Sequence, residues 1–140
     1  MNEIVYEIIK KTNRDDLIEL YKDAGWWQPE NDEADPAFID KIIEGSFCFV
    51  IAKLNNKIIG MGRAISDGVS DAYIQDVVVL TDFRSKGIGK GIINTMLDFL
   101  TKKGITWIGL ISEPGAEKFY DSLNFKVMES YTPYLWKGNK

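Results

Sequence analysis

The feature that most constrains the fold is an apolar run that leads through a glycine-rich turn into a helical pattern. Residues 72–80 end in Val77-Val78-Val79-Leu80, which is apolar on both faces and predicts a strand near the centre of a sheet. Residues 82–91 follow with three glycines and three basic residues. From about residue 87 to residue 103, apolar side chains recur at helical spacing. A buried strand that feeds a helix in this way predicts a sheet covered by helices.

The remaining segments alternate between strand and helix patterns, which favours an α/β or α+β fold with a mixed sheet. The Asn55-Asn56 pair between two strand patterns predicts a two-residue hairpin turn. No repeat or linker divides the sequence, so a single domain over residues 1–140 is expected. Further strands are predicted at residues 4–9, 47–54, 57–65, 105–111, 125–128 and 131–136, and further helices after residue 15, from Pro36 and from Pro114.

Composition removes several classes of chemistry. The chain has no histidine and one cysteine, Cys48, which excludes Ser-His-Asp catalysis, histidine zinc sites and an intrachain disulfide, and no metal is expected. The net charge of −4 argues against a nucleic-acid partner. No apolar run reaches membrane-spanning length and the first residues do not resemble a signal peptide, so we expect a cytoplasmic protein without a membrane partner.

The turn after the predicted central strand has the properties of an anion site. Amides at a helix N-terminus lack intrahelical acceptors, and the helix dipole adds partial positive charge there. Arg84, Lys86 and Lys90 add three cations with no acid between them. The spacing matches neither a P-loop nor the dinucleotide fingerprint. The segment therefore indicates a phosphate site of a kind other than these two. The alternative is a strand-to-helix turn that its glycines make possible, with lysines that face solvent.

Two motifs resemble one known family. The run Arg84-Ser85-Lys86-Gly87-Ile88-Gly89 resembles the Gln/Arg-x-x-Gly-x-Gly/Ala signature of the GNAT superfamily of acetyl-CoA-dependent N-acetyltransferases, and residues 116–125 resemble its second, FYxxLGF-like element. The resemblance implies a central, mostly antiparallel sheet of about 6–7 strands flanked by about 4 helices. It also implies acetyl-CoA as cosubstrate, an amine as acceptor and a homodimer. The run from Gln75 to Val79 is similar to that of a subgroup that includes plant serotonin N-acetyltransferases.

The resemblance assigns residues to the cofactor. The turn amides would hold the pyrophosphate of coenzyme A, and the pantetheine arm would lie along the end of the central strand. Two departures stand out: the segment from Ser112 to Gly115 lacks the asparagine often found there, and Asn124 replaces a glycine. Asparagine tolerates the left-handed conformation, so that turn can survive. The cofactor-binding candidates are Val77, Val78, Val79, Arg84, Ser85, Lys86, Gly87, Ile88, Gly89, Lys90, Ser112 and Lys118.

Two residues are candidates for proton transfer. Tyr120 matches the tyrosine that acts as general acid towards the coenzyme A sulfur in the family, although its pattern alone would fit a packing residue. Asp76 interrupts an apolar strand, where a carboxylate is costly unless it is paired or functional. It could serve as the base or as a structural carboxylate. A water relayed through Gln75 or Tyr73 is the alternative base.

The acceptor amine is expected near the loop that follows the first helix. Trp26, Trp27 and Glu30 combine aromatic faces with negative charge, which suits an ammonium group, although a solvated acidic loop explains them too. Tyr73 and Gln75 are further candidates for this site. The sequence thus predicts an enzyme that transfers acetyl groups to a primary amine. A non-catalytic acyl-CoA sensor and an interaction scaffold are the alternatives.

Overall fold

The computed structural model describes residues 3–27 and 35–139. The chain divides into two compact units, Met1–Leu110 and Ile111–Lys140. Glu30, a candidate for the acceptor site, lies outside the described residues. The single domain expected from the sequence stays a prediction.

The described part of the first unit is built on a five-stranded sheet of order β1-β2-β3-β4-β5. The strands β1 to β4 pair antiparallel in chain order, and β5 pairs parallel with β4. Asn55 and Asn56 have φ angles of 52° and 66° between β2 and β3, which confirms the predicted two-residue hairpin turn. The strand bounds are β1 Val5–Ile8, β2 Cys48–Leu54, β3 Lys57–Ser66, β4 Asp71–Val79 and β5 Trp107–Leu110.

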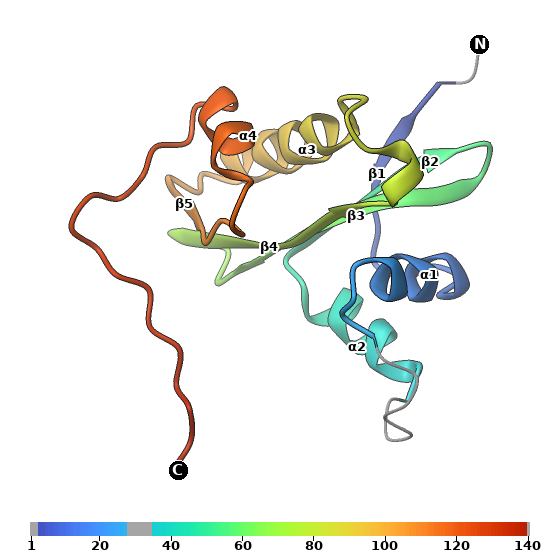
Figure 1. The fold of residues 1–140 in the computed structure, drawn as a ribbon, viewed down its shortest axis with the longest axis horizontal. Coiled ribbons are helices and arrows are strands. Elements are labelled where there is room, and N and C mark those ends of the chain that lie inside the picture. Colours follow the sequence, from blue (N-terminus) through green and yellow to red (C-terminus); the bar gives the residue numbers. More distant parts are fainter. Residues whose placement is uncertain (1–2, 28–34, 140) are drawn as a thin grey trace. The chain divides into compact units, whose positions relative to one another are not determined.

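Helices cover both faces of this sheet. The helix α3, Ile88–Lys102, lies on one face, and α1, Asp15–Asp23, and α2, Ala37–Gly45, lie on the other (Figure 1). Each helix turns an apolar stripe inward, as its sequence period predicts. None of the described helices is long and apolar enough to cross a bilayer. The buried helix residues are Leu17, Leu20, Tyr21, Ile39, Ile43, Ile88, Ile92, Ile93, Met96 and Leu100.

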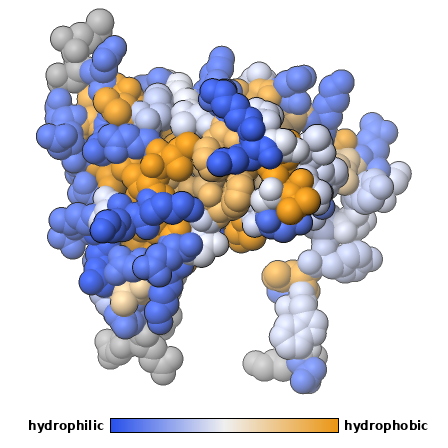
Figure 2. Space-filling model, turned by 180° about the vertical axis from the view of Figure 1, so that it is seen from behind, coloured by the Kyte–Doolittle hydropathy of each residue, from blue (hydrophilic) through white to orange (hydrophobic). Residues whose placement is uncertain are grey.

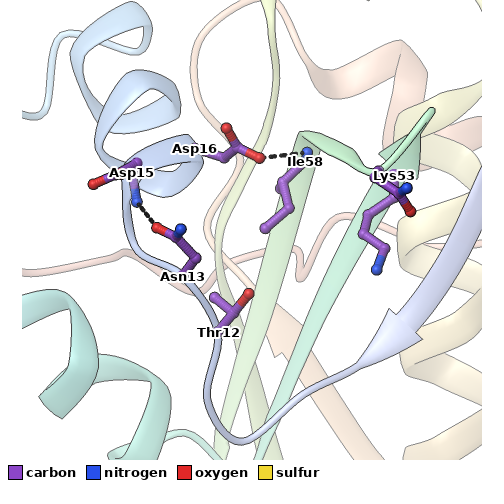
Figure 3. A pocket seen from close by; sticks show the side chains of 7 residues that line it. Thr12, Asn13, Asp15, Asp16, Lys53 and Ile58 are labelled. Atoms are coloured by element: carbon purple, nitrogen blue, oxygen red, sulfur yellow. Dashed lines mark hydrogen bonds between the residues drawn. The ribbon is translucent and has the colours of Figure 1, made fainter.

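The start of α1 is fastened to the β2–β3 hairpin. The amide of Asp15, the first residue of α1, donates to Asn13 Oδ1 at 3.0 Å, and the amide of Ile58 donates to Asp16 Oδ2 at 3.0 Å (Figure 3). A polar pocket of about 280 Å³ lies here, lined also by Lys53. These bonds fix the position of α1 on its face of the sheet. The pocket contains none of the residues that the sequence singles out for the site.

The described part of the second unit contains one short helix, α4, Glu117–Ser122. Residues 123–139 form no strand, so the strands predicted at 125–128 and 131–136 are wrong. The observed sheet therefore has five strands, not six or seven. Alternating apolar residues predict that a segment can form a strand, but a strand also needs a partner for its backbone groups. The described part of this unit supplies none.

Candidate functional site

A β-bulge interrupts β4 at the place where the sequence puts its candidate base. In the pairing of β3 with β4, Met61 faces Val78 and Arg63 faces Gln75, so Gly62 faces both Asp76 and Val77. Asp76 has a φ of 57°, in the left-handed region that aspartate tolerates better than most residues. A bulge leaves one extra residue without a ladder partner. The strand is thereby bent within the run that the sequence assigns to the cofactor.

The bulge sends its two residues to opposite faces of the sheet. A Cβ built on Gly62 would lie 2.8 Å from Ile92 and 3.3 Å from Val77, which places Val77 on the side of α3. Asp76 instead bonds Arg63 on the side of α1 and α2. Gln75 and Tyr73 follow on this second face, because they pair with Arg63 and Ile65. The candidate acid–base and acceptor residues of the first unit therefore share one face.

Arg63 holds the Asp76 carboxylate. Its Nε donates to Asp76 Oδ2 at 2.6 Å, and its Nη2 donates to Gln75 Oε1 at 3.3 Å. The two side chains of the pair are 15% and 30% exposed, so the interaction is partly shielded from water. Asp76 is thus paired, as a carboxylate in an apolar strand must be. Arg63 was not predicted from the sequence, although a lone cation within an apolar strand was a signal that could have found it.

Aromatic residues of α1 and of the segment after it lie on this same face. Tyr21 is 4% exposed and packs edge-to-face against Trp26, with ring centroids 5.6 Å apart, and against Phe38 at 5.9 Å. Trp27 stacks on Phe38 at 4.8 Å and is buried, whereas Trp26 is 38% exposed. Of the predicted pair, Trp26 is therefore the one that a ligand can reach, and Trp27 acts as a core residue.

The face also carries a partly exposed aromatic pair. The rings of Tyr73 and Trp107 lie 5.1 Å apart, and the Trp107 ring covers Gly109, where a Cβ would lie 2.6 Å from it. Tyr73 is 49% exposed and Ile65 is 41% exposed. Figure 2, which views the molecule from behind, shows hydrophobic surface between hydrophilic side chains. Tyr73 is thus available to an apolar or aromatic ligand group.

The turn after β4 has the backbone shape of an anion site. It passes through a single 3₁₀ turn at Thr81–Phe83, and Ser85 and Gly87 adopt left-handed φ angles of 64° and 81°. Gly87 precedes α3, whose first turn has no acidic residue and no side-chain cap. A Cβ built on Gly87 would meet nothing within 4 Å, so the turn is open at this point. Its amides and the dipole of α3 are available to an anion.

The three cations of the turn are not equivalent. Arg84 Nε donates to the carbonyl of Val79 at 3.0 Å, and its Nη2 lies 3.7 Å from Asp23 Oδ2. Lys86 is exposed, with Nζ 5.7 Å from the ring centroid of Phe83, and Lys90 is exposed as well. Arg84 therefore shapes the turn, while Lys86 and Lys90 remain exposed to solvent.

The last glycine of the turn sequence has a packing role. A Cβ on Gly91 would clash with the ring of Tyr6, so this ring occupies the space that any side chain there would need. Gly91 thus permits close contact between α3 and β1. Gly91 belongs to the glycine-rich run of residues 82–91 but is not one of the predicted cofactor contacts.

The second unit carries the candidate acid. The Tyr120 ring packs edge-to-face against Phe119 at 4.9 Å and Phe125 at 5.8 Å. Burial, and to a lesser degree the charge of Glu113, raises the pKa of Tyr120 above 10.0. The hydroxyl therefore keeps its proton at neutral pH. Asn124 has a φ of 69°, which confirms that it adopts the left-handed conformation expected at this turn.

The two other candidates in this unit differ in their surroundings. Ser112 Oγ donates to the carbonyl of Glu113 at 3.0 Å, so its hydroxyl is already used locally. Lys118 is exposed on α4. The roles of Ser112, Lys118 and Tyr120 towards a cofactor stay predictions.

Comparison with known proteins identifies the family. Residues 5–125 match the model of the Acetyltransferase (GNAT) family. The chain is 39% identical over 71 residues to the uncharacterized N-acetyltransferase ycf52 of Pyropia yezoensis, a match that covers 51% of this chain and 41% of that protein.

Solved structures show the same fold. A GNAT family acetyltransferase of Streptococcus pneumoniae TIGR4 has a TM-score of 0.81 at 20% identity, covering 99% of this chain and 100% of that one. The aminoglycoside N-acetyltransferase AAC(6′)-Iy, solved in complex with coenzyme A, has a TM-score of 0.77 at 21% identity, covering 98% and 97%. The mixed α/β fold expected from the sequence is thus confirmed, and placement in the serotonin-acetylating subgroup stays a prediction. The chain belongs to the GNAT family of acetyltransferases.

Proposed function

We propose that this protein transfers the acetyl group of acetyl-CoA to a primary amine by direct attack within a ternary complex. The observation that carries the proposal is the open, uncapped turn from Ser85 to Lys90 directly after the bulged strand β4. Acetyl-CoA supplies an acyl group that is already activated as a thioester. The protein then needs to orient two substrates and manage two protons, which suits a chain without histidine.

The turn fits the phosphates of coenzyme A on structural grounds. Two left-handed residues, Ser85 and Gly87, shape the backbone before α3, and open space lies in front of Gly87. The exposed cations of Lys86 and Lys90 complement the helix dipole there. The remaining proposed contacts of the turn are Arg84, Ile88 and Gly89, where Arg84 acts by holding the turn in shape.

The bulged end of β4 fits the pantetheine arm and the thioester. Because Asp76 and Val77 face a single residue of β3, one backbone group of the strand lacks its ladder partner. An extended ligand arm can use such groups as an added strand would. An unpaired amide can also polarise the thioester carbonyl. We assign Val77, Val78 and Val79 to this role, with Ser112 and Lys118 as further proposed contacts from the second unit.

Proton handling is assigned to Asp76 and Tyr120. The second carboxylate oxygen of Asp76 forms no side-chain hydrogen bond with the described residues, so it can accept the proton that the attacking amine loses. The hydroxyl of Tyr120 stays protonated because burial raises its pKa, so it can donate to the departing sulfur. A water held by Gln75 or Tyr73 is the alternative to Asp76 as direct base.

The amine is proposed to enter on the face of α1 and α2. Trp26 offers an exposed aromatic surface to an ammonium group, and Tyr73 and Gln75 lie on the same face as Asp76. Trp27 supports this surface from the core, and Glu30 is proposed to add negative charge. The proposed acceptor class, primary amines, includes polyamines, arylalkylamines, amino acids and protein amines.

A free-thiol release assay with acetyl-CoA and a panel of primary amines tests the proposal. We expect amine-dependent release of coenzyme A, with the acetylated amine identified by mass spectrometry. Coenzyme A binding without release for any amine would support the alternative, a non-catalytic acyl-CoA sensor. Absence of coenzyme A binding would contradict both readings.

A further inference from the structure

The hydroxyl group of Tyr21 is a buried polar group without a partner. Its oxygen is inaccessible to solvent and forms no hydrogen bond with the described residues. Buried polar groups in folded proteins are almost always satisfied, because an unpaired one destabilises the native state. Phenylalanine would fill the same space without this cost. The hydroxyl of Tyr21 therefore points to a role other than stabilising the ligand-free protein.

Packing fixes the position of the Tyr21 ring. Trp26 and Phe38 hold it edge-to-face from two sides. The carbonyl of Tyr21 also accepts hydrogen bonds from the amides of Trp26 at 2.9 Å and Trp27 at 3.2 Å. These bonds hold the segment after α1 close to the end of the helix. The hydroxyl thus cannot turn towards solvent without disrupting these contacts.

Tyr21 and the Arg63–Asp76 ion pair lie on the same face of the sheet. Tyr21 is on the helix that packs against β3, on the face where Arg63 binds Asp76. The pKa of Tyr21 is raised to about 12, mainly by burial; the carboxylate of Asp76 adds to the rise and the guanidinium of Arg63 opposes it, so both charges act on this hydroxyl. At neutral pH it is therefore a neutral donor close to an anion.

Asp76 has capacity for a second donor. Arg63 Nε occupies Oδ2, and Oδ1 forms no side-chain hydrogen bond with the described residues. A carboxylate oxygen has two acceptor sites, so Oδ1 can accept from a hydroxyl and from an amine at once. Arg63 would then hold one oxygen of Asp76 and Tyr21 the other.

We propose that Tyr21 is a positioning residue that donates a hydrogen bond to Asp76 Oδ1 when the acceptor amine is bound. The inference rests on the proposed function. In the step that it serves, the amine nitrogen forms a bond with the acetyl carbon and gives its proton to Asp76. The carbon–sulfur bond of the thioester breaks, and coenzyme A leaves as its thiol with a proton from the hydroxyl of Tyr120, while Tyr21 keeps its own proton. The role of Tyr21 is to fix the direction of the carboxylate, and Tyr21 does not itself react.

The test is Tyr21→Phe, assayed with whichever of 2-phenylethylamine, spermidine and a lysine-containing peptide the wild-type protein acetylates fastest. We expect kcat to fall about tenfold, the loss of one hydrogen bond to a charged group, with the KM for acetyl-CoA unchanged. The melting temperature should stay at or above that of the wild type, because the variant removes an unsatisfied group. The control Tyr6→Phe removes a hydroxyl on the opposite face of the sheet, against α3, and should leave kcat unchanged.

A double-variant cycle separates positioning from a merely structural role. If Tyr21 acts through Asp76, Tyr21→Phe should have no further effect on kcat in a protein that already carries Asp76→Asn. A wild-type kcat in Tyr21→Phe, or independent effects of the two substitutions, would overturn the inference. A lower melting temperature with unchanged kcat would also overturn it. Thiol release by the wild type with none of the amines would remove the proposed function, and this inference with it.

Discussion

The carboxylate of Asp23, the last residue of α1, binds Thr81 at the beginning of the turn between β4 and α3. The Thr81 amide donates to Asp23 Oδ2 at 2.9 Å, and the Thr81 hydroxyl lies 3.0 Å from both carboxylate oxygens. Arg84 adds a longer ionic contact at 3.7 Å to the same carboxylate. The helix that carries Tyr21 on the proposed acceptor side is therefore joined directly to the turn proposed to bind coenzyme A.

Loss of this contact should weaken the turn. We expect Asp23→Ala to lower the free energy of unfolding by about 1 kcal/mol, since the bonds involve a charged acceptor but are partly exposed to water. Freed from Asp23, the turn should bind coenzyme A about fivefold more weakly, which equals a similar free energy. Urea unfolding and calorimetric titration with coenzyme A measure the two effects.

Thr81→Val provides the matched control for this variant. It removes the hydroxyl contacts and keeps the amide bond to Asp23, so both effects should be smaller than in Asp23→Ala. Equal coenzyme A affinity in the wild type and Asp23→Ala would show that the contact has no influence on the turn.

Replacement of Asp76 should stop proton transfer without disturbing the strand. Asparagine tolerates the φ of 57° at this position as aspartate does, so Asp76→Asn changes the charge and basicity of the side chain while preserving the bulge. We expect kcat to fall by about 10²-fold or more, the usual contribution of a general base. Coenzyme A affinity should not change.

The matched variant for the backbone is Asp76→Val. A β-branched residue is strained at this φ, so Asp76→Val should be less stable than Asp76→Asn. If Asp76→Asn turned over at nearly the wild-type rate, the base would be a bound water and not Asp76.

Tyr120→Phe should separate turnover from cofactor binding. The variant keeps the ring between Phe119 and Phe125 and removes the hydroxyl proposed to protonate the leaving sulfur. We expect thiol release to slow by about 10²-fold and coenzyme A affinity to remain the same. An unchanged rate of thiol release would exclude Tyr120 as the acid.

Gly62 should be required for the close packing of α3 on the bulged region. A Cβ there would lie 2.8 Å from Cγ2 of Ile92 and 3.1 Å from Cε of Met96, and both side chains are fully buried. We expect Gly62→Ala to lower the free energy of unfolding by about 1–3 kcal/mol through overpacking.

Gly45→Ala is the control for Gly62→Ala. A Cβ at Gly45, the last residue of α2, would meet nothing within 4 Å, so the control should lose no stability in the same denaturant titration. Equal stability of the two variants would show that α3 adjusts its position freely.

Local patterns were sufficient to predict most of the first unit. Apolar periodicity and the Asn55-Asn56 turn predicted the helices and the β2–β3 hairpin, because these depend on residues near each other in sequence. The glycine–cation turn before α3 was predicted for the same reason. The bulge at Asp76 was not, because an extra residue in one strand becomes visible only once the register with its partner is known.

The side-chain partners that join neighbouring strands could not be predicted from the sequence either. The pairing of Asp76 with Arg63 joins two strands, and Tyr21 resembled any core residue of an amphipathic helix until its hydroxyl was located. In the C-terminal segment, by contrast, the sequence predicted strands that residues 123–139 do not form. The apolar and aromatic residues at 125–128 and 131–136 indicated strands, although the described part of the second unit offers no partner.

The burial of Tyr21 predicts a specific response to alkaline pH. Its pKa is raised from 10.0 to about 12 in the folded protein, first by burial and then by the charge of Asp76. The folded state therefore binds the phenolic proton more tightly than the unfolded state, so the contribution to stability is complete below pH 10 and decreases as the pH rises towards 12. A shift of this size corresponds to at most about 2–3 kcal/mol at the end of that range.

The comparison of the wild type with Tyr21→Phe isolates this contribution. Tyr6, Cys48 and Tyr120 also have raised pKa values and destabilise both proteins alike at high pH. We expect the free energies of unfolding, measured with urea between pH 8 and pH 12, to diverge above pH 10 as the wild type loses stability faster than the variant. Parallel curves would show that the hydroxyl of Tyr21 is solvated in the free protein, which would contradict both its burial and its proposed place beside Asp76.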